Sequence, residues 1–549
     1  MRGPRVTSPR LLPVLLVGLA ACRESWSGSG PPPGTAATEP GEEVTEVLTG
    51  TTPPDAPPPA DCRLVSDLSD PNFLEGDTVR FTVGCSGSLV TEDAQFKLDT
   101  LPEGAVFDTE TRVFEWRTGP ADGARVDLQF HVLPRDGSTP TPDEGSLTLW
   151  VADDPDNPDN TPVSPEGYTE EWGLPVVHLE APDTLGTADY AEAAVTWYGS
   201  VYPSGVQIHG KTSSNYPKQS YRLRFDDDEL PVASWGVTRD HLILIAVFDD
   251  NSYVRQKFTY DLWWEIANYW GSRRLAPRSF FTVVYLNGSY HGLYMAVDRL
   301  DDEFLDQMGF ERDANLYKAV DTDANFALTD AEGLEKETLH QGFEKTSGEP
   351  PEDFSDLEEL VAFTGSATPE ELVSESSSWL DLSEMMDALL LLFYSNAEDS
   401  YLKNMYIYHD AGGLYRYAPW DFNASWGQNW RTYRVDATYQ EPDAAANRVF
   451  AALLEDPDAN RWMWERFRQM RRLGPFQVER QLSMLDEYYA VIDRSAQRDW
   501  DRWGEAHRTY EGWATARDED LDWTDFEGEK AYMYQWVTDR AAFYESTHP

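Results

Sequence analysis

Lysine is scarce in this 549-residue chain, which has only 9 lysines against 35 arginines, while acidic residues number 97. The resulting net charge of −53 at pH 7 repels the phosphate backbone of nucleic acids, so general DNA or RNA binding is excluded as a function. Histidine is scarce too, and no H-E-x-x-H or paired-His spacing appears, which argues against a zinc hydrolase. A G-x-S-x-G nucleophile elbow is also missing.

Long apolar runs are absent beyond the first 22 residues, since none reaches the ~18 to 20 residues of a membrane-spanning helix. Residues 1–22 have the layout of an export signal, with a basic start and an apolar stretch over 11–21. The end of this stretch, LAAC at 19–22, resembles the bacterial lipobox, in which cleavage before the cysteine leaves it as a lipid-modified N-terminus. The resemblance implies a lipoprotein of the bacterial cell envelope, anchored by Cys22 to the outer membrane or the cell surface.

Cysteine is limited to three residues, too few for a zinc site. Cys62 and Cys85 are 23 residues apart in a chain that we expect to be exported, where thiols oxidise and stay oxidised. The sequence therefore predicts a disulfide between them.

The chain is not disordered throughout, because 13% of its residues are aromatic and that much apolar surface does not stay in water. Residues 23–60, rich in Pro, Gly, Ser and Thr, read as a disordered linker. Residues 61–152 alternate apolar and polar side chains between turns, which predicts a β-sandwich. Within it, residues 101–116 resemble the core of bacterial surface Ig-like domains, which are usually spacers. Residues 153–167 form an acidic, Pro-rich linker.

Residues 168–549 are expected to form one α+β unit, strand-rich at first and helix-rich after about residue 355. Its best chemical signal is a predicted hairpin: Asp399 and Asn404 precede one strand and Asp421 follows the other, so the three can converge. Phosphoryl transfer needs an acid to accept the hydroxyl proton, oxygen ligands for magnesium, and a lysine on the phosphates. In protein kinases the catalytic Asp precedes the metal-binding Asn by five residues, and a further Asp lies beyond the next hairpin. The order of Asp399, Asn404 and Asp421 is therefore kinase-like. The usual H-R-D, G-x-G-x-x-G and D-F-G motifs are missing, so any kinase here is atypical.

Seven segments resemble, in order, the CotH family of atypical kinases, over roughly residues 172–549. They are GLPVV, YPKQSYRLRF, FDDNSYVRQKFTYDL, VVYLNGSYHGLYMAVDRLDD, NLYKA, NAEDSYLKNMYIYHD and YAPWDFNASWG. The resemblance implies Asp399 as the catalytic acid, Asn404 and Asp421 as metal ligands, and either Lys218 or Lys318 as the lysine on the nucleotide phosphates.

Asp250 and Arg255 match a further family block, where they either brace the nucleotide site or form a structural salt bridge. The resemblance also implies a nucleotide-binding role for Asp298, which stands where the family often has Glu before a Lys or Arg. Asn423 stands where the family usually has a second acid after P-W-D, so it offers the metal an amide oxygen in place of a carboxylate. That change is compatible with weaker metal binding, a single-metal site or an inactive enzyme.

The expected fold is therefore multidomain: an Ig-like β-sandwich spacer, then an α+β atypical protein-kinase-like domain with a helical C-terminal region. The expected function is a surface-anchored kinase, using ATP with Mg²⁺ or Mn²⁺, that phosphorylates Ser/Thr hydroxyls of envelope or secreted proteins. Nucleotidyl transfer stays open. The alternative is a catalytically inactive CotH-like surface lipoprotein with an adhesion or envelope-structural role.

Overall fold

The computed structural model describes residues 62–86, 91–134, 143–154, 156, 161–226, 229–440, 442–513 and 525–549. The predicted signal peptide with Cys22, the linker over 23–60 and most of residues 155–160 lie outside the described residues. Within the described parts, no helix has both the length and the apolar character needed to cross a bilayer.

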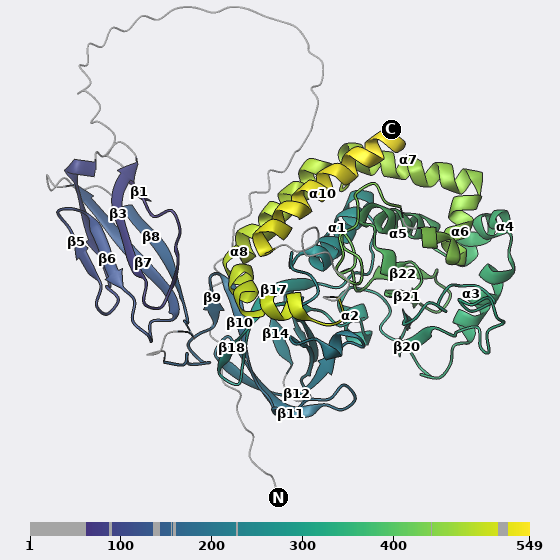
Figure 1. Ribbon diagram of the computed structural model, residues 1–549, viewed down its shortest axis with the longest axis horizontal. Helices are drawn as coiled ribbons and strands as arrows, with labels where there is room; N and C mark the ends of the chain where they lie inside the picture. Colours follow the sequence, from purple (N-terminus) through teal and green to yellow (C-terminus); the bar gives the residue numbers. More distant parts are fainter. Residues whose placement is uncertain are drawn as a thin grey trace, which may run out of the picture. The chain divides into compact units, whose positions relative to one another are not determined.

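The N-terminal region folds into two four-stranded sheets, with strand orders β1-β3-β6-β5 and β2-β8-β7-β4 (Figure 1). Alternate residues of β3, such as Phe81, point inward and share one core with Phe96 and Phe130 of the other sheet. The predicted disulfide between Cys62 and Cys85 is confirmed, with Cα atoms 5.0 Å apart. The strands are β1 (Arg63–Ser66), β2 (Asn72–Leu74), β3 (Thr78–Ser86), β4 (Ala94–Leu98), β5 (Val106–Asp108), β6 (Val113–Arg117), β7 (Ala124–Pro134) and β8 (Asp143–Ala152).

An eight-stranded sheet follows, in the order β11-β12-β13-β16-β18-β17-β10-β9. Strand β11 pairs with both β12 and β10, so the sheet closes on itself. Asn287 and Gly288 join β17 to β18 with φ values of 51° and 76°, as a two-residue type I′ turn requires. The strands are β9 (Glu170–Glu171), β10 (Leu174–Glu180), β11 (Ala191–Trp197), β12 (Ser200–His209), β13 (Ser220–Arg224), β16 (His241–Ile245), β17 (Ser279–Leu286) and β18 (Ser289–Val297), beside a hairpin of β14 (Leu230–Val232) and β15 (Val237–Arg239).

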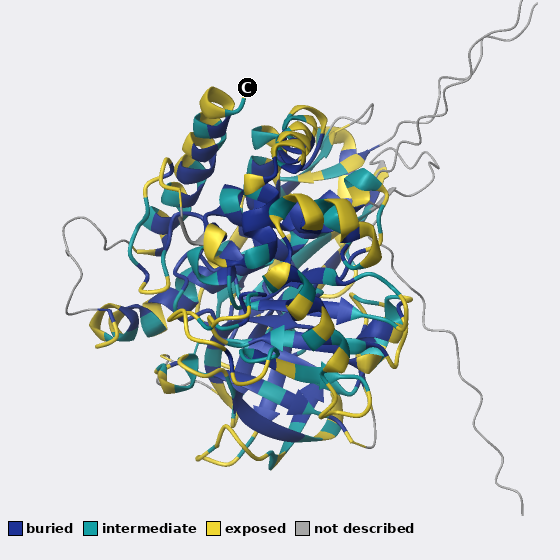
Figure 2. Cartoon of the chain, turned by 90° about the vertical axis from the view of Figure 1, so that its right-hand side faces the viewer, coloured by how far each residue is buried: buried dark blue, intermediate teal, exposed yellow. Residues whose placement is uncertain are grey.

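The rest of the chain combines a four-stranded sheet, in the order β20-β19-β21-β22, with most of the helices. Its strands are β19 (Asn315–Ala319), β20 (Phe343–Ser347), β21 (Met405–His409) and β22 (Arg416–Pro419). The helices are α1 (Arg255–Trp270), α2 (Asp302–Gln307), α3 (Ser355–Ser366), α4 (Pro369–Glu375), α5 (Leu382–Ser395), α6 (Arg448–Glu455), α7 (Pro457–Leu473), α8 (Val478–Thr509) and α10 (Phe526–Thr547). Most strand residues are buried, whereas exposed residues lie mainly on the outer faces of the helices and on loops (Figure 2).

Helix α5 and the β21–β22 hairpin position the segment that the sequence singled out. Asp381 caps α5 by accepting a hydrogen bond from the Glu384 N–H at 3.1 Å. The helix ends at Asn396, which has a left-handed φ of 52° and reverses the chain. Residues 397–404 therefore lead directly from the buried end of α5 to the start of β21.

Candidate functional site

The ends of three strands meet at one edge of the four-stranded sheet. Met405 of β21 pairs with Pro419 of β22 and with Ala319 of β19. The Trp420 N–H donates to the Asn404 carbonyl oxygen at 3.2 Å, and the Asn404 N–H donates to the Ala319 carbonyl oxygen at 3.1 Å. The residues just outside these strands are therefore held side by side.

Asp399 lies at this edge in a short 3₁₀ turn, Glu398–Ser400. The Asn404 amide nitrogen Nδ2 donates to its carboxylate oxygen Oδ2 at 2.9 Å. The Lys403 ammonium contacts the other oxygen, Oδ1, at 3.0 Å. The Asp399 carboxylate is thus oriented by two donors, and its side chain is 29% exposed and so accessible from solvent.

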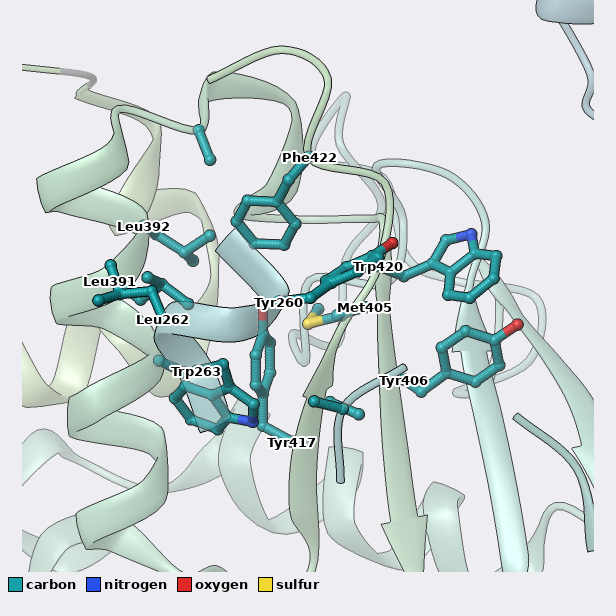
Figure 3. Packing of buried hydrophobic residues seen from close by; sticks show 14 of the residues in the cluster. Tyr260, Leu262, Trp263, Leu391, Leu392, Met405, Tyr406, Tyr417, Trp420 and Phe422 are labelled. Atoms are coloured by element: carbon teal, nitrogen blue, oxygen red, sulfur yellow. The ribbon is translucent and has the colours of Figure 1, made fainter. Parts of the chain in front are cut away.

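Asp421 is the second acid at this edge, and its position is fixed by its neighbours. Trp420 and Phe422 are buried on either side of it in the packed cluster of Figure 3. The Asp421 N–H donates to the Tyr260 hydroxyl oxygen at 3.1 Å. Burial, together with the charge of Asp399, raises the pKa of Asp421 to about 6, against the opposing effect of Lys318 and Lys403.

Asp249 is a third acid, which the sequence reasoning did not assign to the site. The Asn423 amide Nδ2 donates to its Oδ2 at 2.6 Å. The Tyr216 hydroxyl contacts the same oxygen at 3.3 Å. Burial raises the pKa of Asp249 to about 7, with further contributions from Asp421 and Asp250. Its signal in the sequence is its place in FDDNSYVRQKFTYDL, one of the seven segments that resemble the family.

Of the two lysines that the sequence left open for the nucleotide phosphates, Lys318 is the one that lies near these acids. Its ammonium lies 5.4 Å from the centre of the Trp420 ring and 5.8 Å from that of Tyr406. Its positive charge lowers the pKa of Asp421, which places the two groups within electrostatic reach. No ion pair involves Lys318 among the described residues, so its charge is available to an anionic ligand.

Lys218 and Asp298 are not brought to this cluster. The Lys218 ammonium is buried, 2.7 Å from Asp499 and 2.6 Å from the Leu293 carbonyl oxygen. Asp298 is buried between the guanidinium groups of Arg239 and Arg278. These buried ion pairs correct the expectation that either residue offers a free charge to a nucleotide.

Asp250 and Arg255 belong to a buried network beside the cluster. The Arg255 guanidinium pairs with Asp250 and with Glu529 of α10, and its Nε donates to the Ser425 carbonyl oxygen at 3.1 Å. Of the two roles that the sequence left open, the contacts are those of a structural salt bridge that also holds the loop after Asp421.

Another acidic group lies elsewhere, where Asp240, His241 and Asp301 have ligand atoms within 4.8 Å of one another. The Arg239 guanidinium contacts Asp301 at 2.8 Å. Asp301 also caps α2 by accepting a hydrogen bond from the Phe304 N–H. The Arg239 charge and the helix cap account for Asp301, and His241 and Asp240 contact each other at 3.0 Å.

The cluster around Asp421 has the donor set of a hard divalent cation. Asp249 and Asp421 supply carboxylate oxygens. The Nδ2 atoms of Asn404 and Asn423 both donate to neighbouring acids, so their Oδ1 atoms are left as acceptors. Oxygen donors of this kind suit Mg²⁺ or Mn²⁺.

An acid oriented by Asn404, several oxygen acceptors and a lysine that has no ion pair among the described residues lie at one sheet edge, and phosphoryl transfer requires parts of these kinds. Residues 206–544 match the family model described as CotH kinase protein. This match covers more than half of the chain, which therefore belongs to the CotH kinase family.

The chain is also similar to the inner spore coat protein H of Bacillus subtilis (strain 168). The two are 27% identical over 236 residues, which are 43% of this chain. The chain spans 62% of the length of that curated relative.

Proposed function

We propose that the chain is an atypical kinase that transfers the γ-phosphoryl group of ATP to Ser or Thr hydroxyls of envelope or secreted proteins. The observation that carries the proposal is the convergence of Asp399, Asn404 and Asp421 at one sheet edge beside Lys318. Family membership supports the same class of reaction.

Each residue has a role that follows from its contacts. Asp399, oriented by Asn404 and Lys403, accepts the proton of the acceptor hydroxyl as its oxygen bonds to the γ-phosphorus. The bond from that phosphorus to the β,γ-bridging oxygen breaks, and ADP leaves. Lys318 binds the phosphates. A divalent cation bound by Asp421 and the Asn404 Oδ1 would supply positive charge to the transferred group.

The proposal includes a cellular location. Lipidation of Cys22 would hold the kinase at a membrane surface of the bacterial envelope, beside exported proteins that carry accessible hydroxyls. Because ATP is scarce there, transfer during export or with released nucleotide is part of the same proposal.

The test is incubation of the purified chain with an acceptor mixture of envelope proteins, Mg²⁺ or Mn²⁺, and ATP labelled either at the γ- or at the α-phosphate. Asp399→Asn removes the proton acceptor but keeps an acceptor for the Asn404 amide. Asp410→Asn is the matched control, because Asp410 lies in the turn at the other end of the β21–β22 hairpin.

We expect γ-label on protein with the wild type and with Asp410→Asn, and at least ~100-fold less with Asp399→Asn, the range of one general base. Label from α-labelled ATP would indicate nucleotidyl transfer instead. Absence of both labels, together with no rise in the melting temperature on adding ATP and metal, would support the inactive adhesion or scaffold role that Asn423 suggested.

A further inference from the structure

Asp249 and Asp421 come from opposite parts of the domain and lie within electrostatic reach of each other, and Asp249 is bound to Asn423, two residues after Asp421. Asp249 follows strand β16 of the eight-stranded sheet, and Asn423 follows strand β22 of the four-stranded sheet. The Asn423 side chain donates to the Asp249 carboxylate at 2.6 Å. Gln428 in addition donates from Nε2 to the Asp249 carbonyl oxygen at 2.7 Å and to the Asn423 carbonyl oxygen at 3.2 Å. Both the side chains and the backbones of the two segments are thus tied together.

Asp249 differs from its neighbour Asp250 in having no cationic partner among the described residues. The adjacent Asp250 is neutralised by the Arg255 guanidinium. In the described ranges, no Lys, Arg or His forms an ion pair with Asp249, although Asp421 is near enough to repel it. Lys318 and Lys403 offset only the charge of Asp421, and only in part, so two neighbouring carboxylates here are costly unless a cation binds between them.

We propose that Asp249 is a second carboxylate ligand of the divalent cation, so that metal binding joins the strand-rich and helix-rich parts of the domain. This inference rests on the proposed function, because it places a new ligand at the same metal position. Asn423 then has two tasks: its Nδ2 orients Asp249, and its Oδ1 is free to face the metal.

The hydrogen bond and the charge of Asp249 can be separated by substitution. Asp249→Asn keeps a side-chain oxygen to accept from Asn423 but removes the negative charge. The exchange variant Asp249→Asn/Asn423→Asp restores the charge and the Asn–Asp pair with the two partners reversed. A residue that only orients Asn423 tolerates the first change, whereas a charged ligand does not.

The experiment measures metal binding without nucleotide, on the full chain. Mn²⁺ is titrated by calorimetry into the wild type, Asp249→Asn, the exchange variant, Asp421→Asn and the control Asp410→Asn. Terbium luminescence lifetimes in H₂O and D₂O then count the waters on a bound Tb³⁺. Circular dichroism and metal-free melting show which variants are folded.

We expect Asp249→Asn to weaken Mn²⁺ binding about tenfold or more, with about one additional water on Tb³⁺, as for a lost carboxylate ligand. The exchange variant should recover to within about threefold of the wild type. Unchanged affinity and water count in Asp249→Asn, with binding lost in Asp421→Asn, would overturn the assignment of Asp249 alone. Unchanged binding in Asp421→Asn as well, or no binding by the wild type, would remove the metal site and with it the proposed function.

Discussion

Replacing Lys218 by Met tests whether this lysine serves the fold or the nucleotide. Its side chain is 0% exposed and that of its partner Asp499 is 3% exposed. Asp499 also accepts from the Tyr253 hydroxyl at 3.0 Å and the Leu293 N–H at 2.7 Å. Removing the ammonium leaves a buried carboxylate with two neutral donors and no counter-charge, which costs about 3–5 kcal/mol.

The expected loss converts to a shift in melting temperature. An unfolding entropy of about 2.1 cal/mol/K per residue gives roughly 0.7 kcal/mol/K for the approximately 340 residues of the family domain. Lys218→Met should therefore lower the calorimetric melting temperature by roughly 4–7 °C. Lys218→Met/Asp499→Leu should recover part of this loss, because no unpaired charge stays buried.

Lys318→Met is the matched control for this prediction. Lys318 is half-buried and has no ion pair among the described residues, so its loss should change the free energy of unfolding by less than about 1 kcal/mol. It should instead abolish the stabilisation that ATP and metal provide, measured as a thermal shift. The opposite result, an unchanged melting temperature and lost ATP response in Lys218→Met, would refute the structural role of Lys218.

Three other changes have defined outcomes. In the presence of EDTA, Asp421→Asn should have a higher melting temperature than the wild type at pH 8 but not at pH 4. The pKa of the Asp421 carboxyl is raised to about 6 in the folded chain, so the wild type loses stability as the pH rises from about 4 to 6. A difference in melting temperature that does not change with pH would contradict this reasoning. Arg255→Ala should lower the unfolding free energy by about 3–5 kcal/mol in urea titrations, because two acids lose a buried partner, and Arg255→Lys should restore only part. Reduction of the disulfide of Cys62 and Cys85 should destabilise the N-terminal sheets by roughly 3 kcal/mol in calorimetry, while kinase labelling stays unchanged.

Local signals in the sequence predicted the elements better than their arrangement. Asn287-Gly288 specifies a type I′ hairpin by itself, and the apolar run from residue 381 specifies helix α5 with its cap. Closure of the eight-stranded sheet instead depends on pairing of β10 with β11 and, in parallel, with β17. Periodicity identifies a strand but does not say which distant strand it pairs with.

The same contrast holds for the site. Asp399 and Asp421 were predictable because a single hairpin brings them together. Asp249 was not, because it reaches the site through a contact with a residue 174 positions away. For the same reason the sequence left the choice between Lys218 and Lys318 open: the partner of Lys218 is Asp499, 281 residues further on. In a chain this rich in acids, pattern alone cannot tell which carboxylate will face which charge.

Two physical requirements favour Asn at 404 and Asp at 421: the left-handed backbone at both positions, and the contacts of their side chains. Asn404 and Asp421 have φ values of 56° and 58°, in the left-handed region that costs most residues about 1–2 kcal/mol and that Asn and Asp tolerate best. The backbone alone therefore favours Asn or Asp at both positions, whether or not a metal binds. What the backbone does not require is that Asn404 binds Asp399 and that Asp421 lies within electrostatic reach of Asp399 and Asp249. Exchange of Asp for Asn at 421 keeps the backbone preference and removes only the charge, whereas Asp421→Ala adds backbone strain that would be mistaken for a loss of metal.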